Sequence, residues 1–249
     1  MSLVSFQRAM ADLVASPELC RELRRDPAPV LDRYDLTEVE RRRLAQAAAH
    51  RGMAVNCTLY RANRIGVVYT VLGCACFVLG DRLRDEVDRF WAEWGKPDFQ
   101  AQRELHRFAD FLRRRMAAGE LRSPYLEEVL EWELAVYDSG FVPRRETLAA
   151  LARGERADAP LRLHPLLRVV TFRHDPLALL PQLQARRPPP WEADEGEFYL
   201  LVDRRGESRA ASRVDARAGR ALRAVQAGEE VPAAETEVLR AAGLLVRMG

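Results

Sequence analysis

Apolar residues recur at helical spacing through the first part of the chain, and polar start signals divide this pattern into short helices. Ser16 and Asp26 are each followed by proline, which is the usual order of an N-cap and the first helical position. Thr37 and Glu40 have the spacing of a capping box, which opens one further helix. These signals predict a small helical module over residues 1–54.

A larger helical domain is predicted over residues 55–152. Residues 63–79 are rich in β-branched side chains, but the length of this apolar run favours one buried helix over a strand. Another helix is expected to begin at Ser123 and to end at Gly140. Two more helices are indicated by apolar faces, formed by Leu83, Val87, Phe90, Trp91 and Trp94 and by Leu105, Phe108, Phe111 and Leu112.

Strand patterns begin only after a polar segment, residues 153–160, which is typical of a linker. The order of elements beyond it is typical of a small winged-helix-like domain over residues 161–249. The whole chain is therefore predicted to be α+β and mostly helical. The elements expected in the last domain are strands at 167–173, 198–204, 208–214 and 244–247, a short helix at 177–184, a proline-rich loop at 186–195, and helices at 216–227 and 232–242.

Composition and charge exclude several classes of protein. The 249 residues include 39 basic and 37 acidic side chains, so no excess charge points to nucleic acid or to a membrane surface. The longest uncharged run, residues 65–80, is shorter than the roughly 20 residues that span a bilayer. The N-terminus has no basic stretch followed by an apolar one, so no signal peptide is expected and the protein is predicted to be cytoplasmic.

The sequence predicts neither a catalytic constellation nor a metal site in this chain. The four histidines are scattered, and the motifs of zinc enzymes, serine hydrolases and P-loop proteins are absent. Cys74 and Cys76 form a C-x-C pair without further metal ligands nearby, so all four cysteines are expected to be buried and inert. Glu127 and Glu131 share one helix face, which is interpreted as solvated.

A few side chains are of the types favoured at protein interfaces. Tyr60 and Arg61 lie just before the expected buried helix, and Trp132 lies between two glutamates. Packing between helices is the simpler explanation of these three residues when only their types are considered.

Several short motifs follow one another in a specific order. Together they resemble the partner proteins of multinuclear non-heme iron-dependent oxidases, which modify ribosomally made peptides. The resemblance covers roughly residues 55–249. The motifs that carry it are LYRAN at 59–63, FADFL at 108–112, PYL at 124–126 with LEWE at 130–133, LHP at 163–165, FYLLVDR at 198–204, and VD at 214–215 with Leu222 and Gly228.

The first residues carry a different likeness. Residues 34–37 with Glu40, and then residues 51–53, resemble the small helical subunit of extradiol ring-opening dioxygenases. In those enzymes the metal ligands belong to the large subunit. The likeness therefore implies no iron site in this chain.

The resemblance to the oxidase partners implies a non-catalytic adaptor without a cofactor of its own. The C-terminal domain would bind the leader of a precursor peptide, and the helical domain would dock on the oxidase, which would hold the iron. Tyr60, Arg61, Asn63 and Trp132 are the residues expected at the oxidase interface.

Residues 208–214 are the expected place for the leader. They would form an edge strand beside helix 216–227, so that an extended peptide adds as a further strand. Small side chains would leave room for the ligand, and Arg209 and Arg213 would pair with acidic leader residues. A short charged edge that discourages aggregation is the alternative interpretation. The residues of the expected peptide site are Ser208, Arg209, Ala210, Ala211, Ser212, Arg213, Val214 and Leu222.

Two other functions remain as alternatives. A winged-helix DNA-binding regulator would suit the predicted topology, but the candidate recognition helix carries Glu235 and Glu237 with only Arg240, which is the wrong sign for phosphate. The first 50 residues alone would suit the small subunit of an oxygenase.

Overall fold

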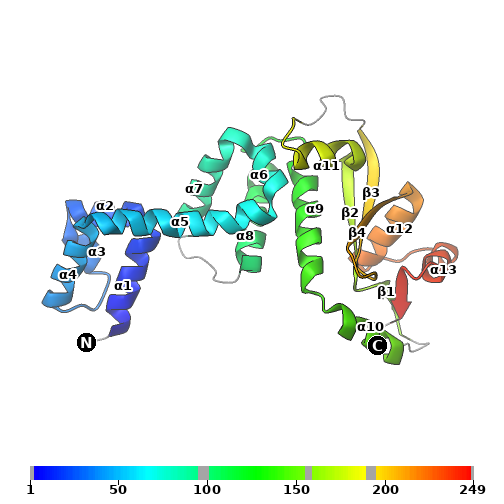
Figure 1. Ribbon diagram of the computed structural model, residues 1–249, viewed down its shortest axis with the longest axis horizontal. Coiled ribbons are helices and arrows are strands. Elements are labelled where there is room, and N and C mark those ends of the chain that lie inside the picture. Colours follow the sequence, from blue (N-terminus) through cyan, green and yellow to red (C-terminus); the bar gives the residue numbers. More distant parts are fainter. Residues whose placement is uncertain (1–2, 95–100, 155–158, 189–194, 248–249) are drawn as a thin grey trace. The chain divides into compact units, whose positions relative to one another are not determined.

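A computed structural model gives the fold of the chain (Figure 1). It describes residues 3–94, 101–154, 159–188 and 195–247. The fold is α+β and mostly helical, with small antiparallel sheets, as the sequence predicts. The chain divides into two compact units, here called unit 1 (residues 1–70 and 81–111) and unit 2 (residues 71–80 and 112–249).

Unit 1 begins with four short helices that pack around a shared apolar core. All three predicted N-caps form: Ser16 Oγ accepts from Leu19 N at 3.1 Å, Asp26 caps the next helix, and Thr37 forms a complete capping box with Glu40. Leu13, Leu23 and Leu44 are among the buried residues of the core. The helices are α1 (Leu3–Ala15), α2 (Pro17–Arg25), α3 (Pro27–Leu31) and α4 (Glu38–Ala49).

The rest of unit 1 is built on the long helix α5 (Arg51–Val71). The domain boundary predicted at residues 54 and 55 lies inside this helix. Helix α7 (Leu83–Glu93) follows the 3₁₀ turn η1 (Gly80–Arg82). The group is completed by α8 (Ala101–Ala117), of which residues 101–111 belong to unit 1. Phe90 contacts Phe108 edge-on, with ring centroids 5.2 Å apart.

The apolar run at residues 63–79 is not one buried helix, which corrects that prediction. Helix α5 ends at Val71, Leu72 leaves the helical conformation, and α6 (Gly73–Leu79) follows in unit 2. The buried carboxylate of Glu133 accepts hydrogen bonds from Cys74 N at 2.7 Å and Ala75 N at 2.9 Å. It thereby satisfies amide groups that a new helix start leaves unpaired, so the chain can break the helix at this point.

Unit 2 is organised around a three-stranded antiparallel sheet in the order β2-β3-β4. Helix α9 contacts β2 on one side, and α12 packs on β2 and β3 (Figure 1). Successive side chains of a strand point to opposite faces, so Tyr199 and Leu201 join the core under α12 while Phe172 contacts Trp132 of α9. The elements are β2 (Leu167–His174), β3 (Glu195–Asp203), β4 (Ala210–Val214), α9 (Leu126–Asp138) and α12 (Ala216–Ala227).

Helix α12 approaches the sheet closely because it has a glycine at the point of contact. A Cβ at Gly219 would lie 2.2 Å from Cγ of Tyr199, so no larger residue fits without displacing the helix. Asp215 caps the start of α12, and Gly228 ends it in the left-handed conformation, both as predicted.

The remaining elements of unit 2 include two that the sequence patterns missed. The short strand β1 pairs with β5 in a two-stranded sheet. Helix α10 covers residues 144–152, for which no element was predicted, and the first two residues of the expected linker. Residues 155–158 of that linker and 189–194 of the proline-rich loop lie outside the described residues. The elements are the 3₁₀ turn η2 (Ser139–Phe141), α10 (Arg144–Gly154), β1 (Leu161–Leu163), α11 (Pro176–Gln184), α13 (Ala233–Ala241) and β5 (Leu245–Arg247).

Within the described residues, no single helix has the length and apolar character that crossing a membrane requires. Helix α5 and the following segment, Gly73–Glu93, meet these criteria only as a bent pair.

Candidate functional site

The three-stranded sheet has two outer edges, and side chains close the edge on β2. Val169 N–H donates to Oε1 of Gln226 at 2.9 Å, and Nε2 of Gln226 donates to the carbonyl oxygen of Val169 at 3.3 Å. The Gln226 amide thus takes the place that the backbone of a further strand would occupy. Arg223 of α12 adds a second donor to the same carbonyl at 3.3 Å.

Further along β2, the buried carboxylate of Glu128 closes the same edge from α9. Its Oε2 accepts from Arg173 N at 2.6 Å, and its Oε1 lies 2.7 Å from Nδ1 of His174. Burial raises the pKa of Glu128, and the hydrogen bonds from Arg173 and His174 oppose this effect. The ring of Tyr125 packs edge-on against His174, with centroids 4.6 Å apart. The β2 edge is therefore held by two helices.

The outer edge of β4 is open. Residues 210–213 are exposed, and Val214 is half-buried. The strand pairs with β3 alone, in the register Ala210↔Asp203 to Val214↔Tyr199. Among the side-chain hydrogen bonds of the described residues, none reaches the backbone of residues 208–214. The edge strand that the sequence predicts is thus present, although Ser208 and Arg209 precede it.

The two arginines expected to meet a ligand have different surroundings. Arg213 lies over the ring of Phe198 at 4.8 Å and forms an ion pair with Asp175 at 3.6 Å. Arg209 is exposed, and its guanidinium lies near Gly140. An acidic ligand would compete with Asp175 for Arg213, but exposed ion pairs of this kind contribute little stability.

The prediction that Leu222 contacts a peptide is wrong. Its side chain is fully buried in the core between α12 and the sheet. Its place in the helical pattern turns it toward Leu167 and Leu201, away from the edge of β4. It supports the fold beneath the candidate site.

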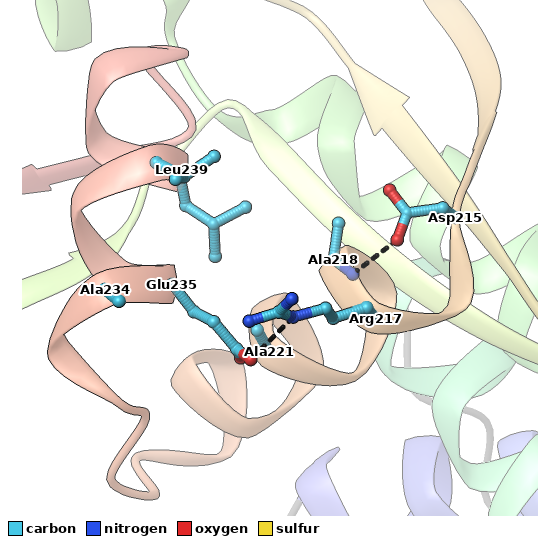
Figure 2. A pocket seen from close by; sticks show the side chains of 8 residues that line it. Asp215, Arg217, Ala218, Ala221, Ala234, Glu235 and Leu239 are labelled. Carbon is cyan, nitrogen blue, oxygen red and sulfur yellow. Dashed lines mark hydrogen bonds and ion pairs between the residues drawn. The ribbon is translucent and has the colours of Figure 1, made fainter.

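A hollow of about 290 Å³ opens where β4 passes into α12 (Figure 2). Ala218, Ala221 and Leu239 form its apolar lining between α12 and α13. Arg217 and Glu235 form an ion pair at 2.8 Å from one helix to the other. No sequence motif predicts this hollow. Its one signal in the sequence is the pair of small residues Ala218 and Ala221, three positions apart on α12, which leaves space beside α13.

The residues expected at an oxidase interface do not form one cluster in either unit. Arg61 is half-buried, where it pairs with Glu18 at 3.3 Å and with Asp88 at 3.5 Å. Tyr60 is also half-buried, whereas Asn63 of the same helix is exposed. Trp132 belongs to unit 2, and its ring centroid lies 6.5 Å from that of Phe172. Tyr60, Arg61 and Trp132 are thus half-buried, and Asn63 is the exposed member of the set.

Helix α5 presents an exposed face without charge, although 31% of the residues of the chain are charged. Asn63 lies on this face. Apolar residues recur along it at alternating spacings of four and three, from Val55 to Tyr69, as at a helix–helix interface. The sequence shows this spacing, but it does not show which side of the helix is exposed. Met53, Cys57 and Val68 of the same helix are also uncharged, and they are buried. The exposed residues from 54 to 70 are Ala54, Val55, Asn56, Thr58, Leu59, Ala62, Asn63, Gly66, Tyr69 and Thr70.

The two glutamates whose helix face was interpreted as solvated are engaged in ion pairs. Glu127 pairs with Arg113 at 3.0 Å, and Glu131 pairs with Arg223 at 2.8 Å. Across the part of the chain that the structure describes, no three His, Cys, Asp or Glu side chains gather as metal ligands would. Neither the models of known protein families nor the curated protein sequences contain a match to this chain.

Proposed function

We propose that this protein is a non-catalytic adaptor in the modification of ribosomally made peptides. It binds the leader of a precursor peptide at the open edge of β4, within a winged-helix-like domain. It docks through its helical part on a multinuclear non-heme iron-dependent oxidase, which holds the iron, in the cytoplasm. The observation that carries the proposal is the open β4 edge in a sheet whose other edge is closed by Gln226 and Glu128.

Strand addition at β4 uses main-chain hydrogen bonds for affinity and side-chain pockets for specificity. Ala210, Ala211 and Ser212 are small, so an incoming strand can approach the backbone without steric conflict. The hollow beside Ala218 lies at the end of the same strand and offers an apolar site for one ligand side chain. Arg209 and Arg213 favour acidic residues in the leader.

The uncharged face of α5 supports the docking half of the proposal. An exposed apolar stripe that contains the small residues Ala62 and Gly66 allows a partner helix to approach closely. A Cβ at Gly66 would meet nothing within 4 Å, so the face has room for a partner there. Asn63 lies within it, so one of the four predicted interface residues is retained on this surface.

The proposal is tested by measuring the affinity of the folded protein for the leader peptide encoded beside it. We expect the double variant Ala211→Pro/Arg213→Glu to lose affinity by more than about tenfold. The register places the N–H of Ala211 on the outer side of β4, so proline removes a donor that the leader would use, and the reversed charge at position 213 repels acidic residues. Arg162→Glu is the matched control, since it makes the same charge change at the one exposed residue of β1, outside the three-stranded sheet. Unchanged affinity in the folded double variant contradicts the proposed site.

Docking is tested separately by size-exclusion chromatography with the neighbouring iron oxidase. Ala62→Arg places a charge in the middle of the uncharged face and is expected to abolish co-elution. Arg51→Ala, at the exposed start of the same helix, is the control. A folded Ala62→Arg variant that still co-elutes shows that the oxidase binds elsewhere.

A further inference from the structure

Three sulfur-containing side chains line one hollow of about 240 Å³ in unit 1. Cys20 lies on α2, whereas Met53 and Cys57 lie one helical turn apart on α5, and all three are buried. The thiols of Cys20 and Cys57 donate to the same oxygen, the carbonyl of Leu13, at 3.1 and 3.4 Å. They also interact with each other. The fold thus gathers two thiols and a thioether from two parts of the sequence.

The charged groups around this hollow are predominantly basic. Arg21, Arg24 and Arg61 line it. Their acidic partners are Glu18, which pairs with Arg21 and Arg61, and Asp88, which pairs with Arg61. The surroundings therefore favour a complex that carries a negative charge.

We propose that Cys20, Cys57 and Met53 form a binding site for Cu(I), a soft monovalent metal ion. Thiolate and thioether sulfurs are the ligands that this ion prefers. In the binding step, each thiol releases a proton and two Cu–S bonds form, while the thioether adds a third contact. The step transfers no electrons, and its product is a bis-thiolate complex of net charge −1 with two protons released. The arginines offset that charge.

Other metals fit the hollow less well. A structural Zn²⁺ site requires four ligands, usually from Cys and His. The residues that line this hollow include neither histidine nor a carboxylate, so a fourth hard or borderline ligand is missing among them.

Burial, with a further effect from Cys57, raises the pKa of the Cys20 thiol to about 12. The metal-free site is therefore protonated and poorly nucleophilic at neutral pH, so it resists oxidation and alkylation. Metal binding must displace protons, so the affinity for Cu(I) falls as the pH is lowered.

The test is an anaerobic titration of the reduced, full-length protein with Cu(I) in competition with a chromogenic chelator. We expect one tight equivalent in the wild type and none in Cys20→Ser or Cys57→Ser. Met53→Leu keeps the volume but loses the thioether, and should weaken binding by about tenfold or more. Cys74→Ser and Cys76→Ser are matched controls, because these buried thiols of α6 lie outside the hollow. They should bind as the wild type does.

A second measurement on the wild type does not depend on the folding of any variant. The maleimide pulse is made long enough to label the buried thiols of the metal-free protein through local opening. Mass spectrometry should then show that one equivalent of Cu(I) slows the labelling of Cys20 and Cys57 more than that of Cys74 and Cys76. The proposal is overturned if no tight equivalent binds to the wild type. It is also overturned if Cys74 or Cys76 is the protected thiol, or if folded Cys20→Ser and Cys57→Ser variants retain wild-type affinity.

Discussion

The two outer strands of the three-stranded sheet meet their surroundings in opposite ways. Gln226 and Glu128, from helices on opposite faces of the sheet, bind the outer backbone of β2. The outer backbone of β4 has no such side chain among the described residues, and residues 210–213 are exposed. Open edges are a liability that proteins normally cover. Within the described residues, β4 is therefore the edge of this sheet at which a further strand could pair.

The largest loss of stability is expected from Glu128→Ala, at the closed edge of β2. The variant leaves Arg173 N–H and the His174 ring without their buried partner, so we expect a loss of about 3 kcal/mol in the free energy of unfolding. Denaturant titration measures the loss. Glu127→Ala is the neighbouring control, because Glu127 forms only an exposed ion pair and should change stability by less than about 0.5 kcal/mol. Equal effects of the two variants would mean that Glu128 does not hold the β2 edge.

A smaller effect is expected from Gln226→Leu. The substitution keeps the apolar stem of the side chain but removes both hydrogen bonds to Val169, which should cost about 1–2 kcal/mol. Gln226→Glu keeps an acceptor for Val169 N–H and should lose less. Hydrogen exchange at the Val169 amide reports on the edge directly and should accelerate in the leucine variant. An amide that exchanges at the wild-type rate would contradict closure by Gln226.

The pH dependence of stability should distinguish the two edges further. Because the folded-state pKa of Glu128 is raised, its protonation favours the folded state. Its contribution to stability is fully present below its unfolded pKa of about 4.5 and is lost as the pH rises through the folded value. Comparing the wild type with Glu128→Gln across this range isolates the effect. A stability difference that stays constant with pH would show that Glu128 titrates normally.

The smallest effect on stability is expected at β4. Ala211→Glu places a charge on the exposed strand and should change the free energy of unfolding by no more than about 0.5 kcal/mol. The same variant should nevertheless weaken leader binding, because its negative charge repels the acidic residues that Arg209 and Arg213 attract. Denaturant titration and peptide binding, measured on one preparation, separate the two effects. A large loss of stability would place β4 in the core of the fold.

Sequence reasoning succeeded where the determining contacts are local. Ser16 and Thr37 cap helices through residues three positions away, and Gly228 ends α12 by its own backbone freedom. Strands β2, β3 and β4 were placed to within about three residues by their composition and turns. The physical basis of each of these predictions lies within a few residues of the element itself.

The errors concern contacts between distant parts of the chain. The break at Leu72 depends on Glu133, and strand β1 has only three residues and is recognisable by its pairing with β5. Helical periodicity places Leu222 on the apolar face of α12. It does not show that the sheet covers that face completely. For the candidate site, the open edge was predictable from turn and strand patterns. The closed edge was not, because Gln226 lies 57 positions from Val169.

The cap that Glu133 provides to α6 also constrains the order in which the chain can fold. Helix α6 has seven residues, which is too short to be stable alone, and its first amides bind a carboxylate 59 positions further along the chain. During synthesis, residues 73–79 must therefore wait for α9 to emerge before they become helical. Until then, the apolar segment that contains Cys74 and Cys76 lacks the helix that packs on it in the folded protein, so it is open to non-native contacts.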